Sequence, residues 1–205
     1  MSSMESLEDL MRDELKDIYD AEKQLTKALP KLAKKASNDQ LRQALEQHLQ
    51  ETEGHIERLE QIFEQLEMPA KGKKCEGMKH LIDEGNDMIA DADDDATRDA
   101  VMIASAQKVE HYEIASYGTL RTWANLLGKN EAAALFEETL EEEKEADLKL
   151  TSIAESAVNA AAAAGDDEQD EEEESPAARG RRVPARGASR TVAADRGRTG
   201  NRGRR

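Results

Sequence analysis

The chain has 205 residues and a formal charge of −16, from 45 acidic and 29 basic side chains. A single cysteine excludes a disulfide scaffold and a metal cluster held by several cysteines, and no apolar run approaches the roughly 18 residues of a membrane span. Because the N-terminus is acidic and does not resemble a signal peptide, we expect a soluble, cytoplasmic protein without membrane contact.

Apolar side chains recur at helical spacing in five segments, and no proline occurs between Pro69 and Pro176, so the sequence predicts an all-α protein. The expected helices cover residues 5–35, 77–91, about 96–127 and about 130–157. Between the first two of these, a further helix is expected to begin at a cap within 37–39 and to end before Pro69. Pro30 should kink the first helix or end it early. Gly128 should end the helix that begins near residue 96.

The lengths of the connections predict how these helices are arranged. Two hairpins with tight turns, joined by a connector of over twenty residues, describe a four-helix bundle with one long crossover, as in ferritin-like folds. The crossover holds a loop over 69–76 and the short extra helix over 77–91. A coiled-coil dimer is the alternative, and it is disfavoured because the helices end at defined breaks instead of continuing in heptads.

Composition changes abruptly at Gly165. Residues 166–174 read DDEQDEEEE and residues 176–205 hold ten arginines and one acid, so the formal charges are −17 for residues 1–165, −8 for the acidic run and +9 for the tail. Neither segment has enough apolar surface to offset the conformational entropy lost on folding. The sequence therefore predicts a ferritin-like helical bundle over 1–165, an acidic disordered linker over 166–175 and an Arg/Gly-rich disordered tail over 176–205.

The arginine-rich tail suggests weak binding to nucleic-acid phosphates without recognition of base sequence. The acidic run can equally fold back and mask the tail, and the acidic bundle would repel nucleic acid. A solubilising extension without a binding role is the alternative interpretation.

Several acidic and histidine side chains lie on or beside the apolar stripes of the predicted helices. They are Glu22 on the first helix, His48, Glu51 and His55 on the second, Glu110 and Glu113 on the third long helix, and Glu143 and Asp147 on the fourth. A buried carboxylate is costly to ionise, so such groups normally pair with a charge or bind a metal. Convergence on four helices favours a shared site over isolated solvated faces.

The acids also agree in depth along the bundle. Glu22 and Glu51 lie fifteen and fourteen residues from a first turn near residue 37, and Glu113 and Glu143 lie sixteen and fourteen residues from a second turn near residue 129. At about 1.5 Å per residue, both pairs are level and near the middle of their helices. Four carboxylates and a nearby imidazole at one depth predict a dinuclear carboxylate site. A purely structural polar layer is the alternative.

Four stretches of the sequence resemble the YciE/YciF group of ferritin-like stress proteins. They are DIYDAEKQLTKALPKLAKKASN, HLQETEGHIERLEQIF, AQKVEHYEIASYGTLRTWANLLG and LEEEKEADLKLTSIA, and the likeness runs from about Ser6 to Ala157. The resemblance implies a ferritin-like four-helix bundle with an extra short helix, a homodimer and a ferroxidase-like activity.

The sequence departs from the usual ferritin-like ligand pattern, in which two helices each carry Glu-x-x-His. Here the second helix offers His48-x-x-Glu51 or Glu51-x-x-x-His55, and the fourth offers Glu143-x-x-x-Asp147. The identity of every ligand therefore has to be assigned residue by residue.

Taken with the resemblance, these residues predict a dinuclear iron or manganese centre in the bundle core. The expected metal ligands are Glu22, Glu51, Glu113 and Glu143, with Asp147, Glu110 and His55 completing or orienting the shell. His48, Tyr19 and Tyr117 are expected to surround them. The other glutamates over 137–145 are expected to form a solvated face.

The expected function is that of a stress-response protein that oxidises Fe(II) or removes peroxide at this centre. The alternative is a non-catalytic interaction protein whose polar core fixes bundle packing, with nucleic-acid binding through its tail. Cys75 is expected to be an incidental free thiol, although three nearby lysines can lower its pKa.

Overall fold

The computed structural model describes residues 4–164, which form helices and connecting segments without a β-strand. The helices are α1 (Leu7–Lys35), α2 (Asp39–Gln65), α3 (Glu76–Asp91), α4 (Asp95–Leu126) and α5 (Asn130–Ile153), followed by a π-helical turn, η1 (Ala154–Val158). The predicted acidic linker (166–175) and tail (176–205) lie outside the described residues. No helix within residues 4–164 has the length and apolar composition needed to cross a bilayer.

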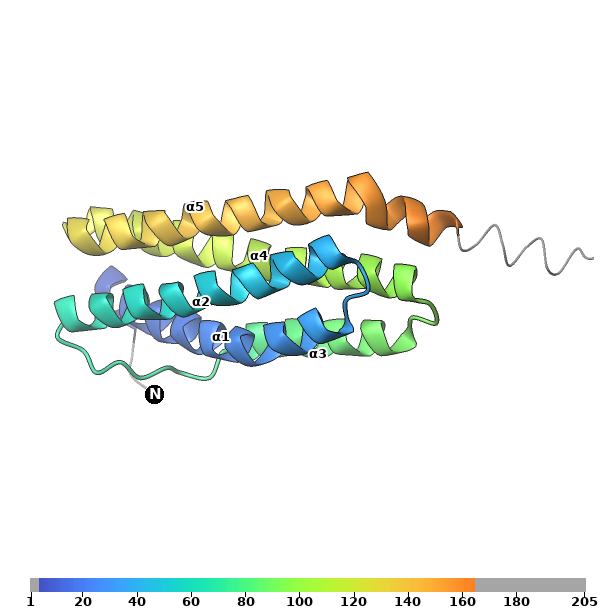
Figure 1. The fold of residues 1–205 in the computed structure, drawn as a ribbon. Coiled ribbons are helices and arrows are strands. Elements are labelled where there is room, and N and C mark those ends of the chain that lie inside the picture. Colours follow the sequence, from blue (N-terminus) through green and yellow to red (C-terminus); the bar gives the residue numbers. More distant parts are fainter. Residues whose placement is uncertain (1–3, 165–205) are drawn as a thin grey trace, which may run out of the picture.

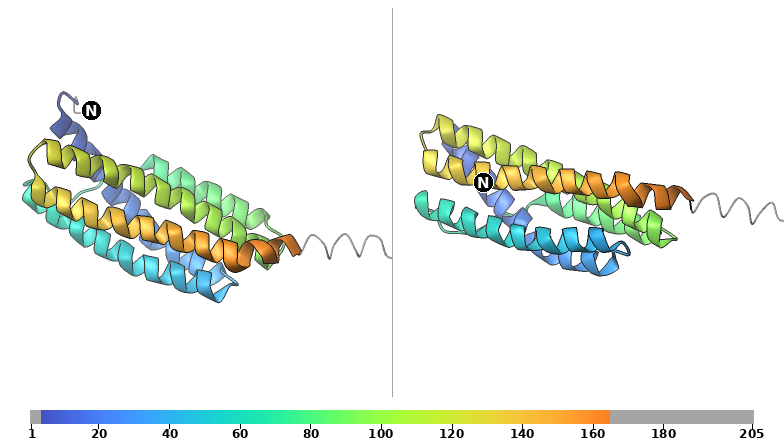
Figure 2. Two further views of the ribbon diagram at one scale, coloured as in Figure 1. Left: turned by 90° about the horizontal axis from the view of Figure 1, so that it is seen from above. Right: turned by 45° about the horizontal axis from the view of Figure 1, so that its top comes forward.

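The four long helices form a bundle of two antiparallel hairpins, α1–α2 and α4–α5 (Figure 1). Around the bundle, α1 contacts α2 and α4, and α5 also contacts α2 and α4. The crossover returns along the bundle, so α2 and α4 run in the same direction, and α3 lies outside the bundle against α4 and α1 (Figure 2). The predicted ferritin-like bundle with a helix in its crossover is confirmed.

Local capping explains where the helices begin and end. Asn38 Oδ1 accepts hydrogen bonds from the amides of Gln40 and Leu41, as the predicted cap of α2 requires. Gly128 has a φ of 71° and follows α4, which confirms the predicted glycine stop. These residues make the turns short, so the hairpin partners are fixed side by side.

Of the two outcomes predicted for Pro30, a kink or an early end of α1, the early end does not occur, because α1 continues to Lys35. Proline removes one backbone donor within the helix, but Leu29 and Ala33 on either side of it are buried in the core. Burial of this last turn therefore offsets the missing hydrogen bond. The helix predicted over about 130–157 is helical throughout, but the π-helical turn η1 interrupts its α-helical geometry after Ile153, and α-helix resumes over 159–164.

Cys75 fixes the start of α3 against α1. Its amide donates to Asp20 Oδ2 at 2.8 Å, and its Sγ lies 3.0 Å from the hydroxyl of Tyr112. Burial of the thiol raises its pKa to about 11, so the suggested lowering by lysines is wrong. The Lys73 and Lys74 ammonium groups instead pair with carboxylates.

Candidate metal centre

Two overlapping groups of acidic and histidine side chains lie in the core, and all four bundle helices contribute to them. The first contains His48, Glu110, Glu113 and Glu143, and the second contains Glu22, His55 and Glu143. Within each group, one donor atom per residue lies within 4.8 Å of the others. Because Glu143 belongs to both, its two carboxylate oxygens are placed to join two neighbouring positions.

These carboxylates are deeply buried and have few hydrogen-bond partners within the described part of the chain. Glu22, Glu113 and Glu143 are each 0% exposed, neither oxygen of Glu113 has a hydrogen-bond partner there, and Glu143 has only ion-pair contacts with His55 and His48. Burial raises the pKa values of Glu110, Glu113 and Glu143, and repulsion from neighbouring carboxylates raises them further. Such an arrangement is unfavourable without a compensating positive charge.

His55 points one ring nitrogen into the centre and the other away from it. Its Nδ1 lies 3.1 Å from Glu143 Oε1 and 3.5 Å from Glu22 Oε1, whereas its Nε2 lies 2.9 Å from Glu142 Oε2. Burial lowers the pKa of His55, but the three carboxylates outweigh burial and raise it to about 12. A cation bound between Glu22 and Glu143 would take over the charge compensation that the imidazolium proton provides.

Glu142 and Arg58 hold His55 in this orientation. Arg58 donates to both carboxylate oxygens of Glu142, at 2.6 and 2.7 Å, and also contacts Thr139 and Glu138. The hydrogen bond from His55, followed by those from Arg58, lowers the pKa of Glu142 to about 2. A carboxylate that fixes the far nitrogen of a histidine is a recurrent support for metal ligands.

Sequence reasoning missed this support because it assigned Glu142 to the solvated face. The available signal was the spacing of His55 and Arg58, which lie three residues apart and therefore share one face of α2. An acid on the facing helix was needed to satisfy both, but the sequence does not show which glutamate of α5 faces α2.

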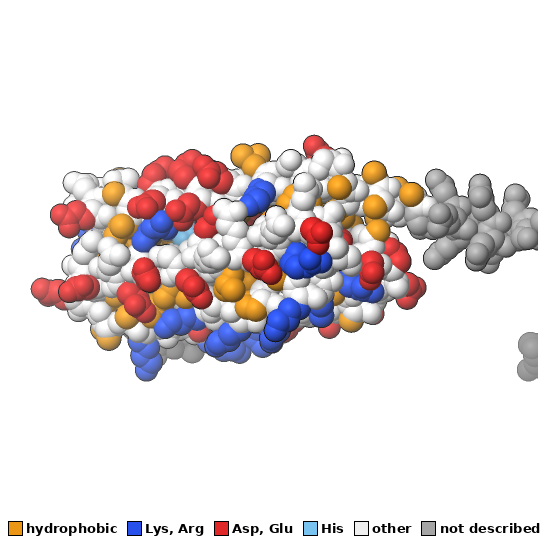
Figure 3. Space-filling view, viewed as in Figure 1, with side chains coloured by type: hydrophobic (Ala, Val, Ile, Leu, Met, Phe, Trp, Pro, Cys, Tyr) orange, Lys and Arg blue, Asp and Glu red, His pale blue; other side chains and the backbone are white. Residues whose placement is uncertain are grey.

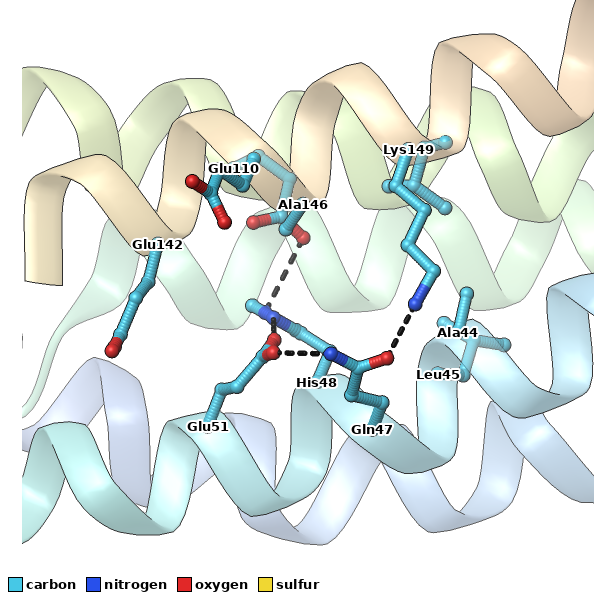
Figure 4. A pocket seen from close by; sticks show the side chains of 11 residues that line it. Ala44, Leu45, Gln47, His48, Glu51, Glu110, Glu142, Ala146 and Lys149 are labelled. Atoms are coloured by element: carbon cyan, nitrogen blue, oxygen red, sulfur yellow. Dashed lines mark hydrogen bonds and ion pairs between the residues drawn. The ribbon is translucent and has the colours of Figure 1, made fainter.

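His48 lies closer to the centre than expected, within the first group rather than around it. Its Nε2 is 3.4 Å from Glu110 Oε1 and 3.8 Å from Glu143 Oε2, and its Nδ1 is 3.5 Å from Glu51 Oε2. Glu51 belongs to neither group, and its side chain is 31% exposed. In Figure 4, Glu51 and Glu110 approach the His48 ring from opposite sides.

Two further predicted site residues are not brought into the groups. Asp147 lies one turn beyond Glu143, where its carboxylate accepts a hydrogen bond from Gln107 at 3.0 Å. The hydroxyl of Tyr19 donates to Glu60 and accepts from Lys23. Both side chains are therefore engaged by neighbours outside the two groups.

Tyr117 lies beside the centre, as expected from the sequence. The hydroxyl of Tyr117 donates to Glu22 Oε1, and the ring is fully buried. This contact joins α4 to α1 and restrains one carboxylate of the second group. The other oxygen, Glu22 Oε2, has no hydrogen-bond partner among the described residues.

The donor set suits divalent cations. It offers four buried carboxylates and two imidazoles, a combination that binds iron, manganese and zinc. With the histidines neutral, two divalent cations would balance the four negative charges. The unpartnered oxygens of Glu113 therefore fit a bound metal better than a self-contained hydrogen-bond network.

Two cavities reach this centre from different sides. The first, which we call the α2–α5 opening, has a volume of about 180 Å³ and is lined by polar and apolar residues of α2 and α5, with His48 and Glu110 at its inner end (Figure 4). The second has a volume of about 40 Å³, lies among α1, α3 and α4, and is mainly apolar. His48 and Glu110 border both cavities.

Comparison with known proteins gives consistent matches over the helical bundle. The family described as "Domain of unknown function (DUF892)" matches residues 6–163. Protein YciF of Escherichia coli K12 is 52% identical over 158 residues, which is 77% of this chain and 95% of YciF.

Solved structures agree with that result. The crystal structure of the E. coli stress protein YciF has a TM-score of 0.73 at 52% identity and covers 76% of this chain and 99% of its own. YcfI from Rhodopseudomonas palustris has a TM-score of 0.72 at 43% identity, covering 74% of this chain and 98% of its own.

Proposed function

This chain belongs to the DUF892 family and is a homologue of the stress protein YciF, and from that premise we propose that it binds two iron or manganese ions in its core as part of a stress response. The observation that carries the proposal is the pair of buried donor groups that share Glu143. The proposed activity is oxidation of Fe(II) or removal of hydrogen peroxide.

Each of the two cations would be held by its own set of residues. Glu22 and His55 would hold one ion, His48, Glu110 and Glu113 would hold the other, and Glu143 would bridge them. Tyr117 restrains Glu22, while Glu142 and Arg58 restrain His55. A bound iron or manganese pair would supply reversible one-electron chemistry at each ion.

Electron balance defines the proposed peroxide reaction. Two Fe(II) substrate ions would each lose one electron, and one H₂O₂ would accept both electrons and two protons to give two water molecules. Burial of the centre keeps bulk water away from the donor atoms, and the α2–α5 opening gives polar reactants access to His48 and Glu110.

Metal content of protein purified without a metal-affinity tag tests the proposal. Wild type incubated with Fe(II) or Mn(II) should hold about two ions per chain, and Glu113→Gln/Glu143→Gln should lose them. The matched control is Glu131→Gln/Glu141→Gln, which removes two exposed charges of α5 and should retain the metal. Wild type that remains metal-free under these conditions would contradict the proposal.

A non-catalytic role is the second candidate, because some polar contacts of the centre also tie helices together. Tyr117 joins α4 to Glu22 on α1, and Arg58 on α2 joins Glu142 on α5. In that case the double variant would alter unfolding or oligomeric state without any change in metal content. Fe(II) oxidation and peroxide consumption by the loaded protein then separate metal storage from catalysis.

A further inference from the structure

The α2–α5 opening carries acidic side chains along its walls. Glu51 projects from α2, and Glu142 and Glu145 project from α5. In the space-filling view, acidic side chains gather over α5, and a histidine surface is visible between α5 and α2 (Figure 3). Oxygen ligands on flexible glutamates can replace the water molecules of a hydrated cation one at a time.

His48 connects this opening to the buried centre. The residue is 6% exposed, and neither ring nitrogen has a hydrogen-bond partner among the described residues. Its Nδ1 faces Glu51 at 3.5 Å, and its Nε2 faces Glu110 at 3.4 Å. A series of donor atoms therefore leads inward from Glu51 through His48 to Glu110.

A lysine stands at the outer end of the opening. Lys149 donates to the side-chain oxygen of Gln47, and the amide nitrogen of Gln47 donates to Glu51 Oε1 at 2.7 Å (Figure 4). These two hydrogen bonds link Lys149 through Gln47 to Glu51 and place the ammonium group beside the acidic wall of the opening. The ammonium group opposes a cation electrostatically at the point where the acids attract it.

From these contacts we infer that the α2–α5 opening is the route by which divalent cations reach the core, and that Lys149, anchored on Gln47, slows their passage. Glu51 and Glu145 attract the cation, and His48 passes it to Glu110. This inference rests on the proposed metal-binding function and concerns how the centre is filled.

The second cavity is a poor alternative route for a cation. Its walls include Leu25, Leu29, Leu81 and Ile89, and its volume is about 40 Å³. Apolar side chains cannot replace the hydration shell of a divalent ion, so passage along these walls would carry a large desolvation cost. The polar opening avoids that cost.

Stopped-flow uptake of Co(II) by the full-length, chelator-treated protein tests the inference, because bound Co(II) absorbs visible light. Lys149→Met should accelerate uptake about three- to tenfold, as expected for removal of one unit charge near the path. Glu145→Gln should slow uptake by a similar factor. The matched controls are Lys144→Met and Glu141→Gln, which make the same charge changes on α5 outside the opening.

Equilibrium stoichiometry is measured on the same samples. Faster uptake by Lys149→Met than by Lys144→Met, with equal final Co(II) content, would support the inference, whereas slower uptake by Lys149→Met would contradict it. Equal rates for these two variants would overturn it, because net charge alone would then set the rate. Wild type that binds no Co(II), Fe(II) or Mn(II) at equilibrium would instead overturn the proposed function, and the uptake route with it.

Discussion

The carboxylate of Glu113 has no compensating hydrogen bond among the described residues, and we propose that its role is to bind a cation. It is 0% exposed, its oxygens are unpartnered among the described residues, and the carboxylates of Glu110, Glu143 and Glu22 raise its pKa together with burial. Glu113→Gln should therefore stabilise the protein in the presence of a chelator, by about 1–2 kcal/mol. Urea unfolding measures the difference against an exposed control, Glu131→Gln.

A loss of stability in the Glu113→Gln variant would instead support the alternative in which the polar core is purely structural. If Glu113→Gln destabilises the chelated protein, its negative charge is needed to balance His48 or His55 within the core. Adding Mn(II) provides a second comparison, because the cation should stabilise wild type more than the variant if Glu113 is a ligand.

Glu142 should affect metal affinity without binding metal itself. It accepts a hydrogen bond from His55 Nε2 at 2.9 Å and leaves Nδ1 directed toward Glu143. Glu142→Gln keeps the shape but loses the negative charge, so Mn(II) affinity should fall about 10- to 100-fold. Competition with a chelator measures the affinity, and Glu141→Gln on the exposed face is the control. Unchanged Mn(II) affinity would show that Glu142 pairs with Arg58 without supporting metal binding through His55.

The helical periodicity of the sequence located some site residues more accurately than others, and the reason is geometric. Glu22, Glu113 and Glu143 lie at the centres of apolar stripes, so a modest error in helix rotation does not move them out of the core. Asp147 and Tyr19 lie nearer the stripe edges, where a similar error selects a different neighbour. Which neighbour a side chain at the stripe edge contacts depends on the facing helix, and a single sequence does not specify that helix.

The α1–α2 hairpin is held by a residue from a different helix. Asp99 of α4 is 3% exposed, and its two oxygens accept hydrogen bonds from the amides of Ser37 and Asn38 at 3.0 and 2.7 Å. Asp99→Ala leaves two amides at this turn unpaired and should destabilise the protein by about 2–3 kcal/mol. Thermal or urea unfolding tests this against Asp93→Ala, which alters an exposed residue of the α3–α4 connection. Equal stability of the two variants would contradict the role assigned to Asp99.

Helix boundaries were predictable where capping chemistry is local. Asn38 and Gly128 act through their own backbone or nearby amides, so their roles are visible in the sequence. The passage of α1 through Pro30 depends instead on burial of the last turn in the assembled bundle. The same limit applies to Asp99, whose partners lie more than sixty residues away in the sequence.

At the scale of the whole molecule, oligomeric state stays a prediction. Leu126 and Leu148 are 72% and 66% exposed on α4 and α5, and a second copy of the chain would cover such surface. Light scattering after gel filtration should give twice the 22.7 kDa of one chain. A mass of one chain that is independent of protein concentration would show that the bundle is stable alone.

The uneven charge along the sequence leads to a prediction about nucleic acid. Residues 1–165 carry a formal charge of −17, whereas residues 176–205 carry +9. Single-stranded DNA should therefore bind the full chain weakly, with an affinity that falls steeply as salt rises from about 50 to 200 mM. Removal of residues 166–205 should abolish binding in a fluorescence-anisotropy titration.

A second deletion separates attraction by the tail from masking by the acidic run. Deleting residues 166–175 removes eight negative charges and keeps all ten arginines of the tail. If the acidic run competes with DNA for these arginines, this variant should bind more tightly than the full chain at the same salt concentration. If the chain truncated after Gly165 binds as well as the full chain, the tail is not responsible. The exposed lysines of α1, Lys27, Lys31, Lys34 and Lys35, would then be the surface to test.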